Sequence, residues 1–364
     1  MIRNQGGRIL VQNVSGGSRH VYQTLDAMRG VAAIAVVMYH ARETVKGVWF
    51  PGYLAVDFFF LLSGFVIAHA YDERLQAGLK GLEFTKARLI RLYPMFILGV
   101  VLAAGIAFAR LPTAVGSSMP RWELAAATAL AAAFLPNPFT PSIFLNGPTW
   151  SLFYELVANI LFAAFHRLVT TTILISIVAV CLVGLIVTAT IENDLNLGFR
   201  AREALGASLR IGYGFFAGVL IYRFRDRIPK VQLSAGLAAL ATCILFVPVP
   251  NVIQGLYAIA FVSVIAPSLL IAGSQVEPSG RLTSLFSYLG MISYPIYVLH
   301  RPLLKLTLVA GYGIAPPWAL AALTIIGLLI LCPMIVKFYD TPLRRWLGRS
   351  THYRLRSAEL QAAP

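Results

Sequence analysis

The chain has 364 residues, of which 58% are hydrophobic and only 12% are charged, and its mean hydropathy is +0.74. A charged share about half that of a typical soluble domain excludes an ordinary water-soluble enzyme. The formal net charge of +15 then fits anionic lipid headgroups better than nucleic acid, which we do not expect as a partner. Apolar runs recur along the chain, and the sequence predicts an all-α, polytopic transmembrane helix bundle in a lipid bilayer.

The predicted spans follow one another with short connectors. We expect about ten, near residues 27–44, 52–71, 92–110, 148–166, 171–190, 207–222, 231–249, 252–273, 285–310 and 317–337. The apolar piece 123–136 is too short for a crossing, which needs about 20 residues, and turn-forming residues follow it. We therefore expect one re-entrant half-helix, beside a cavity near residues 137–150.

The basic residues favour one orientation of the chain. If 123–136 does not cross the bilayer, most of the 30 lysines and arginines lie on the side of the N-terminus, which the positive-inside rule makes the cytoplasmic side. A full crossing would reverse that balance. The sequence thus predicts that both termini are cytoplasmic, with an N-terminal tail (1–24), a membrane domain (25–345) and a basic C-terminal tail (346–364).

Ionisable residues inside predicted spans are costly in lipid, and each is a candidate for function. His40 lies eleven positions beyond Arg29, which a rise of about 1.5 Å per residue converts to roughly 16 Å and so to the outer half of the bilayer. Asp57 and Glu155 are carboxylates expected at about the same depth. Either is expected to orient the imidazole of His40; a structural ion pair is the alternative for each.

A second polar group lies around two prolines near the end of the chain. Tyr297 and His300 are three residues apart and share a helix face. Pro295 and Pro302 each remove a backbone N–H, so we expect a bend with free carbonyl groups. A lined cavity and a local hydrogen-bond cluster are both open interpretations. Arg301 is a candidate ion-pair partner for the intramembrane carboxylates.

Arginines also gather at the inner end of the span near 92–110. Arg88 and Arg91 are three residues apart on one helix face. Guanidinium groups bind phosphates in bidentate fashion, so the pair is a candidate phosphate clamp. Contact with lipid headgroups is the alternative.

The predicted cavity has further polar and aromatic residues. Ser151 shares a helix face with Glu155, whereas Trp150 points away from it. Arg210 begins its span from the outer side. We treat Trp150, Ser151, Arg210 and Arg301 as candidates for substrate binding. No metal site is predicted, because the histidines and cysteines lack the spacing of metal ligands.

The sequence resembles the acyltransferase-3 family of bacterial integral-membrane acyltransferases in five blocks, which occur in the order of the family. The blocks are LDAMRGVAAIAVVMYH, GYLAVDFFFLLSGFVI, FTKARLIRLYP, GPTWSLFYE and ISYPIYVLHRPLL. They match the family's Arg-x10-His pair, its V-D-x-F-F-x-L-S-G-F block, its Arg-x-x-Arg and Pro block, its T-W-S-L-x-x-E and its S-Y-x-x-Y-L-x-H. The resemblance extends from Leu25 to about Arg345.

The resemblance implies an O-acyltransferase of the bacterial cytoplasmic (inner) membrane. Such an enzyme moves an acyl group, with acetyl as the expected one, from cytoplasmic acyl-CoA to a hydroxyl of a carbohydrate such as a cell-surface or exported polysaccharide. Arg29, Arg88 and Arg91 are expected to bind the acyl-CoA. A secondary transporter or flippase is the alternative function, since intramembrane charges are expected there too.

Within this reading, His40 is expected to be the general base, because histidine titrates near neutral pH. The rival route is an acyl-enzyme formed on His40. Glu155 or Asp57 would orient its ring. His300 or Tyr297 would contact the thioester oxygen or the acceptor.

Overall fold

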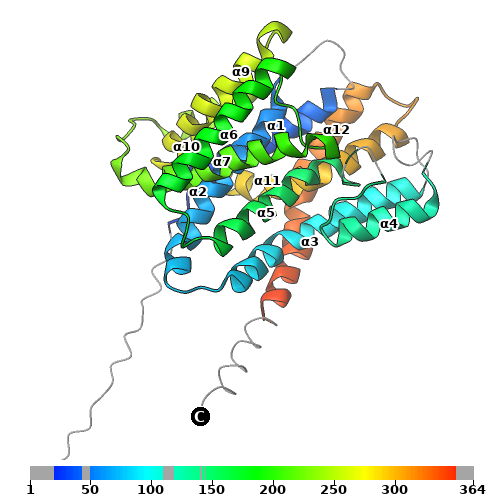
Figure 1. Cartoon of the computed structure of the whole chain (residues 1–364). Coiled ribbons are helices and arrows are strands. Elements are labelled where there is room, and N and C mark those ends of the chain that lie inside the picture. The colour runs from blue at the N-terminus through cyan, green and yellow to red at the C-terminus, as the bar shows by residue number, and fades with distance from the viewer. Residues whose placement is uncertain (1–19, 43–49, 110–118, 140–141, 143, 350–364) are drawn as a thin grey trace, which may run out of the picture.

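The computed structural model describes residues 20–42, 50–109, 119–139, 142 and 144–349, and within them every regular element is helical (Figure 1). The predicted all-α class is confirmed. The α-helices are α1 (Gln23–Ala41), α2 (Ala55–Gln76), α3 (Gly81–Phe108), α4 (Arg121–Ala132), α5 (Trp150–Ala164), α6 (Thr171–Glu192), α7 (Ala204–Phe224), α8 (Ala235–Ala241), α9 (Gln254–Ala260), α10 (Ala266–Ser274), α11 (Arg281–Ala310) and α12 (Pro317–Ile335).

Seven helical stretches of the described chain are long and apolar enough to cross a membrane. They are Gly52–Gln76, Gly81–Phe108, Thr171–Glu192, Ala201–Arg227, Asn251–Ser274, Arg281–Ala310 and Pro317–Arg349. The transmembrane bundle is thereby confirmed, and each stretch overlaps one of the predicted spans. The other three predicted spans fall on α1, on the 15-residue α5 and on Ala235–Phe246, which are shorter or less apolar. The count of ten and the sides of the termini stay predictions, and most of both predicted tails lies outside the described residues.

The outer surface of the bundle is apolar. Only 17% of the most apolar stretch of α6 and 33% of that of Pro317–Arg349, which contains α12, is buried, although their mean hydropathies are 2.8 and 2.7. Large apolar side chains therefore point away from the protein, which is the arrangement that lipid tails require. Examples on these two helices are Ile175, Val180, Val183, Ile191, Leu323, Ile326 and Ile330.

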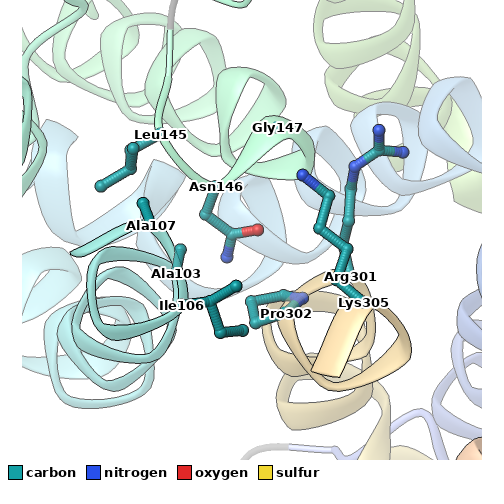
Figure 2. A pocket seen from close by; sticks show the side chains of 9 residues that line it. All are labelled: Ala103, Ile106, Ala107, Leu145, Asn146, Gly147, Arg301, Pro302 and Lys305. Atoms are coloured by element: carbon teal, nitrogen blue, oxygen red, sulfur yellow. The ribbon is translucent and has the colours of Figure 1, made fainter. Parts of the chain in front are cut away.

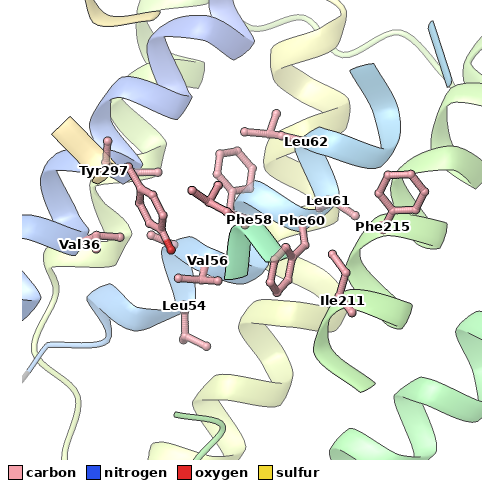
Figure 3. Packing of buried hydrophobic residues seen from close by; sticks show 14 of the residues in the cluster. Val36, Leu54, Val56, Phe58, Phe60, Leu61, Leu62, Ile211, Phe215 and Tyr297 are labelled. Carbon is pink, nitrogen blue, oxygen red and sulfur yellow. The ribbon is translucent and has the colours of Figure 1, made fainter. Parts of the chain in front are cut away.

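The interior of the bundle is organised around two helix pairs. Helix α11 packs against α1 and also contacts α3 and α12, while α2 packs against α7. A methyl group on Gly64 of α2 would lie 1.8 Å from the carbonyl oxygen of Phe215, and one on Gly218 of α7 would lie 2.1 Å from that of Leu61. The two backbones therefore touch, as small residues permit between membrane helices. Figure 3 shows Leu61 beside Phe215 in this contact.

The prolines inside helices leave carbonyl groups that side chains from elsewhere then satisfy. Pro302 has no N–H for the carbonyl of Val298, four residues earlier, and Asn146 Nδ2 donates to that oxygen at 2.9 Å. Pro333 likewise leaves the carbonyl of Leu329 free, and the hydroxyl of Tyr288 donates to it at 2.7 Å. The free carbonyl predicted at Pro302 is therefore present, and these two bonds each fix a neighbouring segment in place.

The predicted half-helix 123–136 corresponds to α4, a 12-residue helix that lies beside α3 at the edge of the bundle (Figure 1). The hydroxyl of Tyr93 donates to the carbonyl of Ala132 at 2.9 Å. The backbone then turns at Phe134, which has a φ of 62° and stacks on Phe96. A re-entrant position in the bilayer remains a prediction.

Candidate functional site

Two histidines that are far apart in the sequence meet between α1 and α11. The Nε2 atom of His300 lies 3.1 Å from the Nδ1 atom of His40, and the ring centroids are 4.9 Å apart. His300 is fully buried, whereas His40 is partly exposed. The two histidines that the sequence predicted at a common depth are thus in direct contact.

Backbone carbonyls determine which ring nitrogens carry protons in this pair. Nδ1 of His300 faces the carbonyl oxygens of Ile296 and Tyr297 at 3.0 and 2.8 Å. A carbonyl only accepts, so this nitrogen is the N–H, and Nε2 of the neutral ring accepts from Nδ1 of His40. The same Nδ1 also faces the carbonyl of Val36 at 3.0 Å. These partners assign the lone pair of His40 to Nε2, to which the described residues make no hydrogen bond.

This arrangement differs from the predicted orienting carboxylate. Neither Asp57 nor Glu155 contacts His40, whose ring is held by His300 and by the carbonyl of Val36. A backbone oxygen and a second imidazole can fix a tautomer as a carboxylate can, without placing another charge inside the bundle.

Asp57 forms a buried ion pair with Arg210. The Nε and Nη2 atoms of Arg210 donate to the two carboxylate oxygens at 2.9 and 2.7 Å, and the side chains are 1% and 2% exposed. Arg210 Nη1 also donates to the carbonyl of Leu197 at 2.6 Å, and its guanidinium lies 5.3 Å from the Trp150 ring. Asp57, Arg210 and Trp150 thus form one packed unit that joins α2, α5 and α7.

Glu155 has different partners. Its Oε1 accepts from the hydroxyl of Ser63 at 2.6 Å and from Nη2 of Arg88 at 3.2 Å. Arg301, which we expected as an ion-pair partner for the carboxylates, contacts neither of them. The sequence argument placed Glu155 and Arg88 at opposite ends of the bundle, but the structure puts them in contact.

A stripe of polar side chains on α11 connects these groups. It consists of Ser293, Tyr297 and His300, which lie on successive turns of the helix. Ser293 accepts from Nε of Arg29 at 2.9 Å. The hydroxyl of Tyr297 lies 2.6 Å from that of Ser151. The stripe therefore faces α1 and α5, and it places polar groups along α11 from the contact with Arg29 to the histidine pair.

The hydroxyl protons of Tyr297 and Ser151 are both engaged in hydrogen bonds within the protein. Both face the carbonyl oxygen of Pro148, at 3.0 Å for Tyr297 and 3.2 Å for Ser151. One hydroxyl donates to that carbonyl and the other donates to its hydroxyl neighbour, so neither proton is left over. The contact with a thioester oxygen that we expected for Tyr297 or His300 therefore lacks a spare donor in this state.

The remaining predicted binding residues are placed as follows. Arg29 bridges α1 to α11 and pairs with Asp26 at 2.8 Å. Arg91 is exposed at the surface, one helical turn from Arg88. Arg301 lines a pocket beside the histidine pair, described below with Figure 2.

Three polar residues of this region were not singled out by the sequence. Ser63 and Ser293 contact the predicted glutamate and arginine, and Asn146 holds the Val298 carbonyl. A signal existed for Asn146, because Pro302 frees a carbonyl that some buried donor must satisfy. No spacing rule could have indicated the two serines. In the described part of the chain, no group of three or more metal-binding side chains is present.

Comparisons with known proteins agree with this architecture. A family model described as "Acyltransferase domain" (Acyl_transf_3) matches residues 22–337. "Protein 2 in picA locus" of Rhizobium radiobacter is 40% identical over 177 residues, which cover 45% of this chain and 93% of that protein. No solved structure matches the chain.

Two longer matches are named as acyltransferases. "Acyltransferase MdmB" of Streptomyces mycarofaciens is 27% identical over 90% of this chain and 92% of its own length. "O-acetyltransferase OatA" of Staphylococcus aureus is 26% identical over 88% of this chain, which spans 57% of the length of that protein. The match of the family model to most of the chain shows that this multi-pass membrane protein is an enzyme of the acyltransferase-3 family, as its five sequence blocks had indicated.

Proposed function

We propose that the protein transfers an acyl group, with acetyl as the expected one, from acyl-CoA to a hydroxyl of a carbohydrate such as a cell-surface or exported polysaccharide. The observation that carries this proposal is the His40–His300 pair, in which carbonyl partners leave a lone pair on His40 Nε2. A neutral imidazole with an available nitrogen is suited to general-base chemistry. Family membership favours transfer over the transporter alternative.

The proposed step is direct transfer. His40 Nε2 accepts the proton of the acceptor hydroxyl while the hydroxyl oxygen attacks the thioester carbonyl. The new C–O bond replaces the C–S bond, and the same imidazole returns the proton to the departing CoA thiolate. During the step, the Nδ1–H of His40 stays bonded to His300 and to the carbonyl of Val36, which stabilises the transient imidazolium without a carboxylate.

We place the donor at the end of the bundle where α3 begins. Arg91 is exposed there, whereas Arg29 is partly exposed and already bonded to Asp26 and Ser293, so Arg91 is the more open of the two to a phosphate group. Arg88 is engaged by Glu155, and its role is to extend this positive region inward. The acyl arm of CoA would run along the polar stripe of α11 toward His40, with the CoA on the cytoplasmic side and the acceptor on the other.

The test uses purified protein in nanodiscs, acetyl-CoA and de-O-acylated envelope polysaccharide from the organism that carries this chain. Free CoA is measured with a thiol reagent, and the acyl group on the glycan is measured by mass spectrometry. We expect His40→Ala to lose about 10²-fold or more of the activity. His166→Ala, which removes a histidine bonded only to the nearby carbonyl of Ala163 in the described structure, is the matched control.

Two results would contradict the proposal. One is full transfer by the His40→Ala protein. The other is a wild-type protein that releases no CoA with any envelope glycan fraction. Label from radioactive acetyl-CoA that stays on the wild-type protein without an acceptor, and is absent from His40→Ala, would replace direct transfer by the acyl-enzyme route.

A further inference from the structure

A pocket opens beside the histidine pair, between α3, α11 and the segment before α5. Its volume is about 30 Å³, which is room for an acidic group and a hydroxyl rather than for a whole sugar ring. One wall is apolar and comes from α3, and the other carries the cations of α11 (Figure 2). The residues that line it are Ala103, Ile106, Ala107, Leu145, Asn146, Gly147, Arg301, Pro302 and Lys305, with no acidic residue among them.

Asn146 presents an unsatisfied group to this pocket. Its side chain is 2% exposed, and its Nδ2 is committed to the carbonyl of Val298. Its Oδ1 is buried and has no hydrogen-bond partner in the described residues. Figure 2 shows this oxygen on the side that faces Arg301 and Lys305. A buried amide oxygen of this kind requires a donor, which a ligand hydroxyl would supply.

Arg301 is the second unsatisfied group. It is partly buried, and the described residues give it neither a hydrogen bond nor an ion pair. An arginine within an apolar helix is costly unless something neutralises it. Its planar guanidinium fits a carboxylate or a phosphate in bidentate fashion. Lys305, one helical turn further on, adds positive charge to the same wall.

The position of the pocket separates it from the proposed donor site. Arg88 and Ala107 are both on α3, and a rise of about 1.5 Å per residue puts roughly 28 Å between them. CoA phosphates bound near Arg88 and Arg91 would therefore not fill this pocket. Arg301, by contrast, directly follows His300 in α11, so the pocket lies at about the depth of the histidine pair, on a neighbouring face of that helix.

We propose that this pocket receives the acidic group of a sugar of the acceptor while the sugar ring stays at its mouth, with the carboxylate or phosphate on Arg301 and a neighbouring hydroxyl donating to Asn146 Oδ1. The acceptor is then a negatively charged glycan, and the pocket sets which of its hydroxyls reaches His40. This inference rests on the proposed acyl transfer and deepens it.

The experiment compares three forms of the de-O-acylated envelope polysaccharide from the organism that carries this chain. One is untreated, one is carboxyl-reduced so that uronic acids become neutral sugars, and one is dephosphorylated. Binding is measured by the thermal stability of the protein in nanodiscs of zwitterionic lipid, and transfer by CoA release. Each form is tested with wild type, with Arg301→Gln and with Arg202→Gln, a matched loss of charge at an exposed arginine of the short helix Ala201–Glu203.

We expect one of the two treatments to lower kcat/KM about tenfold to a hundredfold, and this treatment identifies the acidic group as a carboxylate or a phosphate. Arg301→Gln should raise KM for the untreated glycan by a similar factor and weaken its thermal stabilisation, while Arg202→Gln should change neither. Equal use of all three forms, or an Arg301→Gln protein that behaves like Arg202→Gln, would overturn the pocket assignment. Binding that depends on Arg301 without any CoA release would keep the pocket and refute the transfer function.

Discussion

His40 donates through Nδ1 to Nε2 of His300 at 3.1 Å, although 260 positions of sequence separate the two residues. The proton of His300 is itself fixed by two carbonyl oxygens of its own helix. Protonation of His300 would require its Nε2 to donate toward a nitrogen that already carries a proton. The pair is therefore an ordered chain of donors that ends at the lone pair of His40.

Replacement of His300 tests this chain of donors. We expect His300→Leu to lower kcat by about 10²-fold, because Nδ1–H of His40 loses its ring partner and the lone pair is no longer held at Nε2. His300→Gln, whose amide oxygen is able to accept from His40, should recover part of the rate. The measurement is CoA release at saturating acetyl-CoA. Equal rates for the Leu and Gln proteins would show that the acceptor atom at this position does not matter.

The same chain of donors predicts a direction for the pH dependence. General-base catalysis needs neutral His40, so the transfer rate should fall as acidification protonates the pair. A plot of log kcat against pH should have an acidic limb with a slope of one in the wild-type protein. A rate that does not fall at any acidic pH at which the protein stays folded would argue against His40 as the base.

The Asp57–Arg210 pair is expected to be structural. Removing one partner leaves a charge buried without compensation, at a cost of about 3–5 kcal/mol, so Asp57→Ala should lower the unfolding temperature strongly. Asp226→Ala is the control, because Asp226 pairs with Arg225 at a largely exposed position and exposed pairs contribute little. Similar unfolding temperatures for the two variants would show that the buried pair is not needed for folding.

The close contact of α2 and α7 gives a second stability test. Gly218→Ala should destabilise the protein by about 1–3 kcal/mol, because the new methyl group would meet the Leu61 carbonyl. Gly327→Ala in α12 meets no atom within 4 Å and should be tolerated. The unfolding temperatures of the two purified variants decide the matter, and a tolerated Gly218→Ala would mean that the helices can separate at little cost.

A double-mutant cycle tests the carbonyl of Val298. Asn146→Ala alone should lower the free energy of unfolding by about 1–3 kcal/mol, because the buried carbonyl oxygen of Val298 loses its donor. In a Pro302→Ala background the restored backbone N–H satisfies the same carbonyl, so the second substitution should cost much less. Equal costs in both backgrounds would mean that Asn146 acts through other contacts.

Hydrophobic patterning and the chemistry of the polar residues were enough to predict the helices and the common depth of the two histidines. The apolar runs predicted the helices, since a bilayer admits little else, and depth counting brought His40 and His300 to one level. Depth alone could not select partners. Asp57 had several arginines within reach along the membrane normal, and the choice of Arg210 over Arg301 depends on α2 lying against α7. Which helices are neighbours depends on side-chain packing, and the positions of the spans in the sequence do not determine it.

The error over Glu155 has a related cause. Its position near the start of α5 suggested a place level with His40, and the first turn of α5 does lie near that level, because Ser151 contacts Tyr297 one turn before His300. Glu155 lies one turn further along α5, where its carboxylate reaches Ser63 of α2 rather than His40. Glu155 meets Arg88 of α3 instead.

The missing N–H of Pro302 also has a consequence for how this sequence can change. The segment before α5 is attached to α11 by a side-chain amide, and that attachment is required only while a proline occupies position 302. The two positions are therefore expected to vary together among related chains. A chain that replaces the proline regains a backbone donor, and only then is the asparagine free to change and the pocket free to accept a different acceptor.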